Sequence, residues 1–475
     1  MRKLYQQMSL FDTYNDVCEA MENDKSAVIA LLEEHIDFES LIPGSFFLSF
    51  YKSNGRPRGY SLVSFIKMFV IQKILDIPKD TTLLAVLKIS AELRDFCELD
   101  KVPDASKLTR FKQDFVKEIK RLFDNLVELT EPICREIDPK KSDYLIYDTT
   151  GIEANVAENN PKFLNTKLKQ AKKLAKKNPE INPYALAYSQ MPDTADANPL
   201  VKLQYINGGF NYAFKAGVLT DGLGIVRDIA FFDEEFKHNH PEVVSQKTDN
   251  PDLDKEIGDS TSLKPVLNDF FKTHPTFSYS TFLGDSAFDT YNTYSILRKD
   301  FKFKRMAISL NPRNSSAAHE DFDENGIPLC PIDKTPFLFI GVCRGNNRSE
   351  RLKFVCHKSI PVPKSSQRTC ICDSPCTDSP YGRCVYTYPD KDLRTYPGIL
   401  RGTEHWNNLY RHRILVERTI NILKDPLGAG FRRSYSIRTA KADLLFAGIT
   451  HLVCVVLAHA INKPELYKSV RKLTA

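Results

Sequence analysis

The sequence predicts an α/β fold: a mixed sheet with flanking helices, preceded by an all-helical segment and interrupted by a cysteine-rich insertion. Apolar residues recur at helical spacing through residues 1–140, a pattern typical of packed helices. After residue 141, short apolar runs that carry aspartates alternate with helical patterns, which is typical of an α/β sheet. Residues 312–400 are rich in Pro, Ser and Gly instead. We therefore expect four parts, 1–140, 141–311, 312–400 and 401–475, of which the second and fourth form one core.

Composition bounds the class of protein. A chain of 475 residues predicts two or three domains, and 42% hydrophobic with 27% charged residues is typical of a soluble globular protein. The net charge of +6 permits a polyanionic partner but hardly argues for one. The amino terminus lacks the apolar run of a signal peptide, and eleven cysteines in such a chain indicate a reducing compartment. We therefore expect a cytoplasmic protein.

One apolar run raises the question of a membrane span. The segment from Leu444 to Ile461 is long and apolar, but Thr450, His451 and His459 interrupt it. No similar run occurs elsewhere in the chain. A buried core helix is therefore favoured over a membrane helix, and no membrane partner is expected.

The first 140 residues predict helices over 62–75, 81–89 and 106–129. Basic residues lie near the starts of these helices, as in a helix-turn-helix DNA reader: Arg56, Arg58, Lys107, Arg110 and Lys112. A helical packing domain with solvated cations fits the same residues. Both interpretations stay open on the residues alone.

Two aspartates follow predicted strands. Residues 143–148 form a short apolar run that predicts a buried strand with Asp148 at its end, and residues 280–289 predict a second strand that delivers Asp285 among small residues. Between them, the stretch 208–232 predicts a hairpin, followed by a polar connection and an apolar helix. A further helix and a strand over 303–310 come next.

A lysine-rich segment covers residues 159–177. Such a run is most often a solvated helix, but lysines without interleaved acids also suit an arm that follows a phosphate backbone. The sequence does not decide between these two interpretations.

The cysteine-rich insertion suggests a structural zinc site that stabilises a segment too rich in loops to build a core. Its spacings are C-x-C and C-x-x-x-C rather than paired C-x-x-C knuckles, so free thiols or redox disulfides remain alternatives. The candidate zinc ligands are Cys330, Cys343, Cys356, Cys370, Cys372 and Cys376.

The stretch 410–424 predicts a helix with one polar stripe. At about 100° per residue, the side chains of Tyr410, Arg413, Glu417 and Lys424 fall within roughly 60° of one another. Apolar residues occupy the opposite side, so this face can be buried. A carboxylate between cations suits metal-assisted phosphoryl transfer, although a solvated helix face explains the same residues.

Further basic and aromatic residues flank this helix. Arg432 and Arg433 lie in a basic loop after it, where they would hold backbone phosphates. Trp406, the only tryptophan, lies just before it and either packs in the core or stacks on an unpaired base.

The combined motifs carry a family resemblance. The spacing Y-x2-R-x3-E-x6-K, together with DTTGIEA after the first strand and GDSAFD after the second, resembles the Y-R-E-K signature of DDE transposases encoded by bacterial insertion sequences. The stretches GRPRGYS and VPDASKLTRFKQDF are similar to the helical amino-terminal domain of that family. The resemblance implies an RNase H-like core, and a DNA-end-binding role for residues 1–140.

The resemblance also implies roles for residues. Asp148, Asp285 and Glu417 would form a triad that holds two Mg²⁺ or Mn²⁺ ions, while Tyr410, Arg413 and Lys424 would grip phosphates near the cleaved end. The implied reaction is cleavage of insertion-sequence ends and transfer of the 3′ hydroxyl to target DNA, by two-metal phosphoryl transfer.

The same resemblance implies the partners. These are double-stranded DNA, as terminal inverted repeats and as target, and a second copy of the chain in a synaptic complex, associated with the bacterial nucleoid when bound. Two alternatives remain: a catalytically inactive or domesticated DNA-binding protein, and a metal-dependent nuclease of the same fold.

Overall fold

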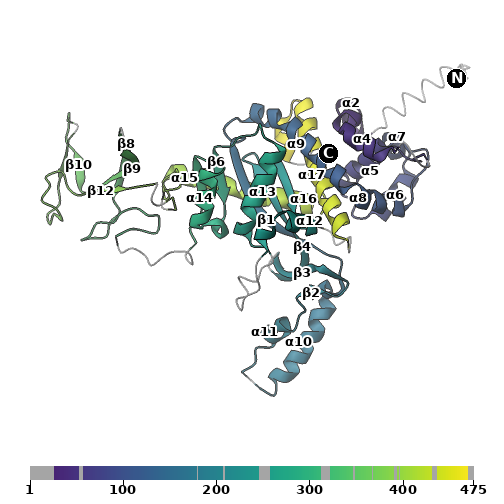
Figure 1. Cartoon of the computed structure of the whole chain (residues 1–475), viewed down its shortest axis with the longest axis horizontal. Helices are drawn as coiled ribbons and strands as arrows, with labels where there is room; N and C mark the ends of the chain where they lie inside the picture. Colours follow the sequence, from purple (N-terminus) through teal and green to yellow (C-terminus); the bar gives the residue numbers. More distant parts are fainter. Residues whose placement is uncertain are drawn as a thin grey trace, which may run out of the picture.

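The computed structural model describes residues 26–52, 57–178, 180–206, 209–244, 257–311, 321–345, 348–365, 367–389, 393–394, 396–430 and 436–468. Figure 1 shows a central sheet with helices on both faces. The helical amino-terminal segment lies on one side of this body, the insertion lies on the opposite side, and an arm projects below.

The amino-terminal segment is helical, as predicted. Its helices are α2 (Ala27–His35), α3 (Phe38–Leu41), α4 (Gly44–Phe50), α5 (Leu62–Ile74), α6 (Asp80–Ile89), α7 (Ala91–Phe96), α8 (Ala105–Asp114) and α9 (Val116–Ile137). The single helix expected over 106–129 is two helices, because the chain leaves α-helical geometry at Phe115. A cluster of aromatic rings packs there, including Phe65 stacked on Phe111 with centroids 4.5 Å apart.

The central sheet combines parallel and antiparallel strands. Its strands are β1 (Tyr144–Glu153), β2 (Thr194–Ala195), β3 (Asn198–Ile206), β4 (Gly209–Asp221), β5 (Val226–Phe231), β6 (Thr281–Gly284) and β7 (Arg305–Ile308). The order across its main body is β5, β4, β1, β6, β7. Strands β1, β6 and β7 are parallel, and β4 runs antiparallel both to β1 and to its hairpin partner β5.

Strand β1 is longer than expected. The apolar run was predicted to end at Asp148, but β1 continues to Glu153 because residues 145–153 pair along their whole length with β4. Asp148 therefore lies in the middle of a strand rather than at its end. The predicted hairpin over 208–232 and the short strands that carry Asp285 and residues 305–308 are confirmed.

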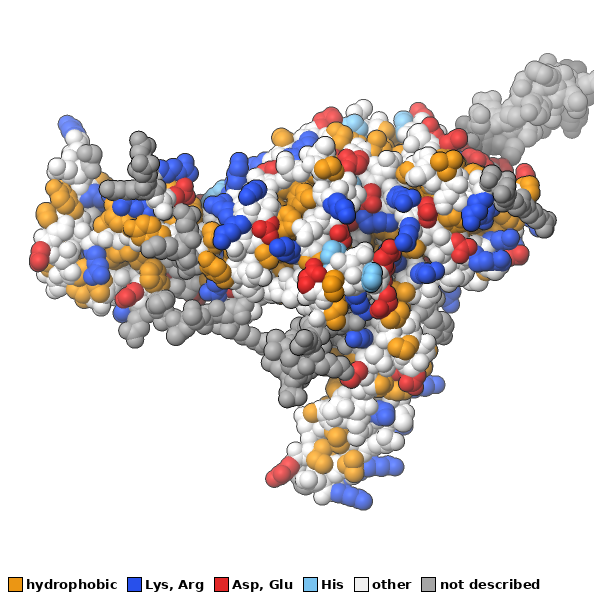
Figure 2. All heavy atoms as spheres, in the orientation of Figure 1, with side chains coloured by type: hydrophobic (Ala, Val, Ile, Leu, Met, Phe, Trp, Pro, Cys, Tyr) orange, Lys and Arg blue, Asp and Glu red, His pale blue; other side chains and the backbone are white. Residues whose placement is uncertain are grey.

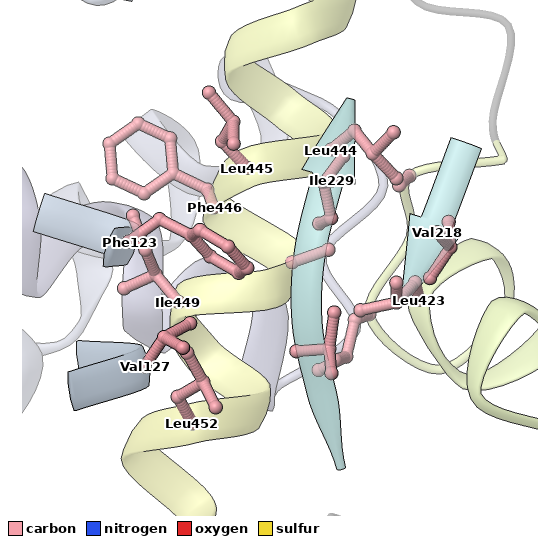
Figure 3. Close-up of a cluster of buried hydrophobic side chains, with 14 of the residues drawn as sticks. Phe123, Val127, Val218, Ile229, Leu423, Leu444, Leu445, Phe446, Ile449 and Leu452 are labelled. Carbon is pink, nitrogen blue, oxygen red and sulfur yellow. The ribbon is translucent and has the colours of Figure 1, made fainter. Parts of the chain in front are cut away.

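Helices cover both faces of the sheet. One face is covered by α13 (Asp259–Thr273), whose Ser262 hydroxyl lies 2.7 Å from the Tyr147 hydroxyl of β1. The other face packs against α9, α16 (Ile414–Lys424) and α17 (Ile437–Ala460). Figure 3 shows the side chains of α9, α16 and α17 meeting Val218 and Ile229 of the sheet. The short helices are α12 (Glu234–Asn239), α14 (Tyr291–Lys299) and α15 (Glu404–Tyr410).

Helix α17 is the predicted apolar segment. By length and composition it could cross a membrane, but 89% of its most apolar window is buried inside the protein. It also contacts both the helical segment and the sheet: Phe446 packs 4.5 Å from Phe69 of α5, measured between ring centroids. A Cβ added at Gly448 would lie 2.7 Å from Phe123 of α9 and 2.8 Å from Ile229 of β5. The prediction of a buried core helix is confirmed.

The arm was only partly predicted. It consists of α10 (Pro161–Ala175), α11 (Pro183–Ser189), and the strands β2 and β3, which extend the sheet from the long strand β4. The lysine-rich segment is helical as expected. Helix α11 and both strands were not predicted.

The insertion builds a small core of its own. A three-stranded antiparallel sheet is formed by β8 (Leu338–Gly345), β9 (Arg348–Val355) and β12 (Cys384–Thr387), beside the hairpin β10 (Ser359–Pro361) and β11 (Arg368–Cys370). Its buried residues are Cys330, Phe337, Leu352, Phe354, Cys356 and Leu400. The expectation of a segment too rich in loops to build a core was therefore wrong.

Candidate active site

Three acidic side chains from three separate elements meet at one guanidinium group. The Arg413 Nη2 atom lies 3.2 Å from Asp148 Oδ2 and 3.6 Å from Asp285 Oδ2. Its Nη1 atom donates a hydrogen bond to Glu417 Oε1. The structure thus brings together the three acids that the sequence singled out, although they are far apart along the chain.

Strand β1 aims Asp148 at this site by simple alternation. Successive side chains of a strand point to opposite faces. Tyr147 is fully buried against α13, so Asp148 points to the face covered by α16. The Thr149 backbone N–H donates to Asp148 Oδ1 at 2.8 Å, which helps to fix the carboxylate.

Asp285 lies at the same level of the sheet as Asp148. Strands β1 and β6 are parallel, with Ile146 paired to Leu283, so each aspartate follows two residues after this pair. Asp285 comes directly after β6 and accepts a hydrogen bond from the Ala287 backbone N–H at 2.9 Å. The two carboxylates are therefore placed side by side by strand register.

Glu417 reaches the site from α16. The single helix expected over 410–424 is interrupted, because residues 411–413 form a 3₁₀ turn between α15 and α16. The Thr419 hydroxyl donates to the Gly224 carbonyl at 2.6 Å, which docks α16 on the β4–β5 turn. The predicted apolar face of the helix is buried, with Val416 and Leu423 fully enclosed.

The three acids carry more negative charge than Arg413, the cation that contacts all of them, can neutralise. Burial raises the pKa of Asp148 to about 6, and the nearby Asp285 adds to this while Arg413 opposes it. Burial also raises the pKa of Asp285, with further increases from Asp259 and Glu417. The Arg413 Nε atom is buried without a hydrogen-bond partner. The site is therefore an electronegative cluster of three carboxylates around the Arg413 guanidinium.

A fourth acid lies beside these three. Asp259 at the start of α13 accepts a hydrogen bond from the Thr149 hydroxyl at 2.6 Å and pairs with Lys215 Nζ at 2.6 Å. Its charge raises the pKa values of both Asp148 and Asp285. The sequence predicts a polar connection in this region, and no motif marks Asp259.

The remaining residues of the predicted polar stripe lie around the acids in different settings. Burial lowers the pKa of Lys424, against the opposing charges of Glu153, Asp425 and Asp148. Tyr410 stacks on Trp406, with ring centroids 4.7 Å apart and planes within 11°. Trp406 is half-buried in this stack.

The other predicted DNA contacts either lie outside the described residues or belong to the helical amino-terminal segment. Arg56, Arg432 and Arg433 lie outside the described residues. Arg58, Lys107 and Arg110 are exposed.

The prediction that Lys112 contacts DNA was wrong. It is fully buried and pairs with Asp80 at 2.9 Å and Asp443 at 2.8 Å. A side chain enclosed between two carboxylates cannot reach a phosphate, so Lys112 holds α8 against α6 and α17 instead.

The described cysteines of the insertion form no disulfides. Cys330 and Cys356 are buried in the small core, while Cys343, Cys370, Cys372 and Cys376 are half-buried and Cys384 is exposed. Charges on Cys330, Cys376 and Cys370 each raise the pKa of Cys356, after the larger effect of burial. Within the described ranges, no three His, Cys, Asp or Glu side chains are arranged to hold a metal ion. Zinc therefore stays a prediction.

Part of the chain matches a known family model. Residues 16–114 match the family model described as "Transposase domain (DUF772)". No curated protein matches the chain. A solved structure described as the piggyBac transposase synaptic complex with hairpin DNA is similar over 94% of this chain and 79% of that chain, with 11% identity and a TM-score of 0.40.

Proposed function

We propose that this chain is a DDE transposase, which cuts DNA at the ends of an insertion sequence and joins the freed 3′ hydroxyl to target DNA. The convergence of Asp148, Asp285 and Glu417 on Arg413 carries the proposal. The transposase domain matched at residues 16–114 supports it independently of the site.

The sheet supports an RNase H-like core. The order β5, β4, β1, β6, β7, with the hairpin antiparallel and the other three strands parallel, is the arrangement that this proposal requires. Under the proposal, one acid comes from the central strand, one from the end of its neighbour and one from a helix on the same face.

The chemistry and charge of the three acids suit divalent cations, which would have to displace Arg413, because no three acids of the described residues are arranged around a metal ion in this structure. Three carboxylates and one guanidinium leave about two negative charges in a partly buried site, which is the balance that Mg²⁺ or Mn²⁺ would neutralise with oxygen ligands. We assign Asp148, Asp285 and Glu417 as the residues that would hold two such ions. When bound, the ions would activate the attacking oxygen and stabilise the leaving oxygen at phosphorus.

The remaining side chains prepare and position the substrate. Arg413 holds the three carboxylates together until the site is loaded, and its guanidinium is then free to bind a phosphate beside the cleaved bond. Lys424, in the last turn of α16, lies within electrostatic range of Asp148 and would supply a second cation. The raised pKa of Asp148 means that it is ionised above about pH 6, so ligation is favoured at neutral pH.

The decisive experiment uses purified protein with Mn²⁺ and a labelled duplex that carries the terminal inverted repeat of its element. Wild-type protein should nick the repeat end and join pre-cleaved ends to a target duplex. Asp148→Asn, Asp285→Asn and Glu417→Gln should each abolish cutting and retain end binding, and the Asp269→Asn control, exposed on α13, should leave cutting intact.

Other results would change the assignment. Binding without nicking by the wild-type protein would indicate a regulatory DNA-binding protein. Cutting without joining would indicate a nuclease. Cutting that survives any of the three substitutions would remove that residue from the site.

A further inference from the structure

The projecting arm carries a stripe of four exposed lysines. The stripe consists of Lys162, Lys169 and Lys173 of α10 and of Lys176, which caps its carboxyl end. At helical geometry their positions fall within about 60° around the helix axis and extend over about 21 Å. All four side chains are exposed. Figure 2 shows basic side chains along the projecting arm and at its tip.

Nothing within the described part of the chain neutralises this stripe. Helix α10 has no acidic residue. None of its four stripe lysines has an ion-pair partner there. Lysines three and four residues apart on a helix repel one another, so the stripe weakens its own helix. This is the charge pattern of a surface that binds a polyanion.

The arm is held rigidly at its base. The buried Asn159 side chain donates hydrogen bonds to the Ala154 and Tyr212 carbonyls, both at 2.8 Å, and accepts one from the Tyr212 backbone N–H at 2.8 Å. The Tyr212 hydroxyl donates to the Pro192 carbonyl at 2.5 Å. Satisfied buried hydrogen bonds of this kind fix geometry.

The arm also starts from the strand that carries Asp148. Strand β1 ends at Glu153, and the chain enters the arm directly after it. The lysine stripe therefore has a defined position relative to the three acids.

We propose that the lysine stripe of α10 binds the phosphate backbone of duplex DNA outside the reacting bond, without reading sequence. This proposal rests on the proposed function, because that function is what would bring DNA to the three acids. Duplex DNA carries one charge for about every 1.7 Å of its axis, so a 21 Å length carries roughly twelve phosphates, and those on the near side face the stripe. Lysines bind phosphates as flexible point charges, which suits contact without sequence preference.

The test measures the salt dependence of DNA affinity for the full chain. The probe is a fluorescent 25-base-pair duplex of arbitrary sequence, titrated at several NaCl concentrations. The test variant combines Lys162→Gln, Lys169→Gln, Lys173→Gln and Lys176→Gln. A matched control with the same charge change combines Lys140→Gln, Lys272→Gln, Lys299→Gln and Lys463→Gln, which are all exposed outside the arm.

The test variant should lose at least about tenfold in affinity at 100 mM salt. Its slope of log affinity against log salt should fall by about 0.9 for each phosphate contact removed. The control should change both quantities much less. A variant with arginine at the four stripe positions should restore affinity, and unchanged circular dichroism shows that α10 persists.

Three results would overturn the inference. Equal effects of the arm and control variants would remove the arm from DNA binding and leave the proposed transposase intact. An arm variant with weaker binding but an unchanged salt slope would exclude phosphate contact by these lysines. Wild-type protein that binds no duplex would refute the proposed function and the arm together.

Discussion

Arg394 and Asp289 form a two-point ion pair between the end of the insertion and the loop after β6. The Nε atom lies 3.1 Å from Oδ1 and the Nη2 atom lies 2.7 Å from Oδ2. Asp289 is fully buried and also accepts hydrogen bonds from the Tyr294 hydroxyl and the Asn311 backbone N–H. Asp289 follows Asp285 by four residues, so the returning end of the insertion braces the loop that carries the second acid.

Removal of Arg394 should destabilise the protein strongly. Arg394→Ala removes one partner of a two-point ion pair with a buried carboxylate, which costs about 3–5 kcal/mol in the free energy of unfolding. Urea denaturation measures the loss. The control is Arg344→Ala, because Arg344 is 80% exposed in its pair with Glu350, and loss of an exposed pair costs about 1 kcal/mol or less. Equal losses in the two variants would show that the Asp289 pair does not brace the loop.

Removal of Arg413 should strengthen metal binding in the absence of DNA. Arg413 occupies carboxylate oxygens that a divalent ion would use. Arg413→Gln frees them and should raise Mn²⁺ affinity about tenfold, since breaking partly buried ion pairs costs on the order of 1 kcal/mol. Isothermal titration calorimetry measures this affinity. DNA cleavage should fall at the same time, because the phosphate contact is lost. Unchanged or weaker Mn²⁺ binding would contradict the assignment of these acids as ligands.

A methyl group at Gly217 should displace the tyrosine beside the first acid. A Cβ at this position would lie 2.5 Å from the Tyr147 hydroxyl oxygen and 2.8 Å from its ring. Because Tyr147 is fully buried, Gly217→Ala should cost about 1–3 kcal/mol through overpacking. Gly44→Ala provides the control, since a Cβ there meets nothing within 4 Å. Thermal unfolding compares the two, and a neutral Gly217→Ala would show that Tyr147 moves freely.

His451 should make the fold sensitive to acid. It is buried in α17, and burial, with a further contribution from Arg227, lowers its pKa to about 4. The unfolded histidine takes up its proton near pH 6.5, so the folded state is fully favoured above that pH. This stability is lost as the pH falls from 6.5 to 4, by up to about 3 kcal/mol.

The measurement is the free energy of unfolding as a function of pH. His451→Leu should flatten the curve between pH 6.5 and 4. His238→Gln, at an exposed position on α12, is the control and should leave the curve unchanged. An acid dependence that survives His451→Leu would assign the effect to other groups.

The sequence predicted the three acids because each sits in a strong local pattern. Asp148 and Asp285 belong to short apolar runs that can only be buried strands, and Glu417 lies opposite a buried helix face. Strand register then brings Asp148 and Asp285 side by side. That register depends on the pairing of two strands that lie more than a hundred residues apart in the sequence. The convergence was predicted only through the family resemblance.

The missed features depend on distant partners. Asp259 lies in a polar stretch, and its place beside the site follows from the docking of α13 on β1. Lys112 looked like a surface cation because the carboxylate that buries it, Asp443, comes more than three hundred residues later. No local sequence pattern predicts that Asp259 lies beside the site or that Lys112 pairs with Asp443.

Helix α17 has a consequence for shortened forms of the protein. Its side chains fill the interior of the helical amino-terminal segment and of the sheet alike, and it is synthesised after both. A product that stops before residue 437 would leave each of them with an open apolar surface, and such surfaces lead to aggregation and degradation. Premature termination would therefore yield fragments that do not persist beside the intact protein.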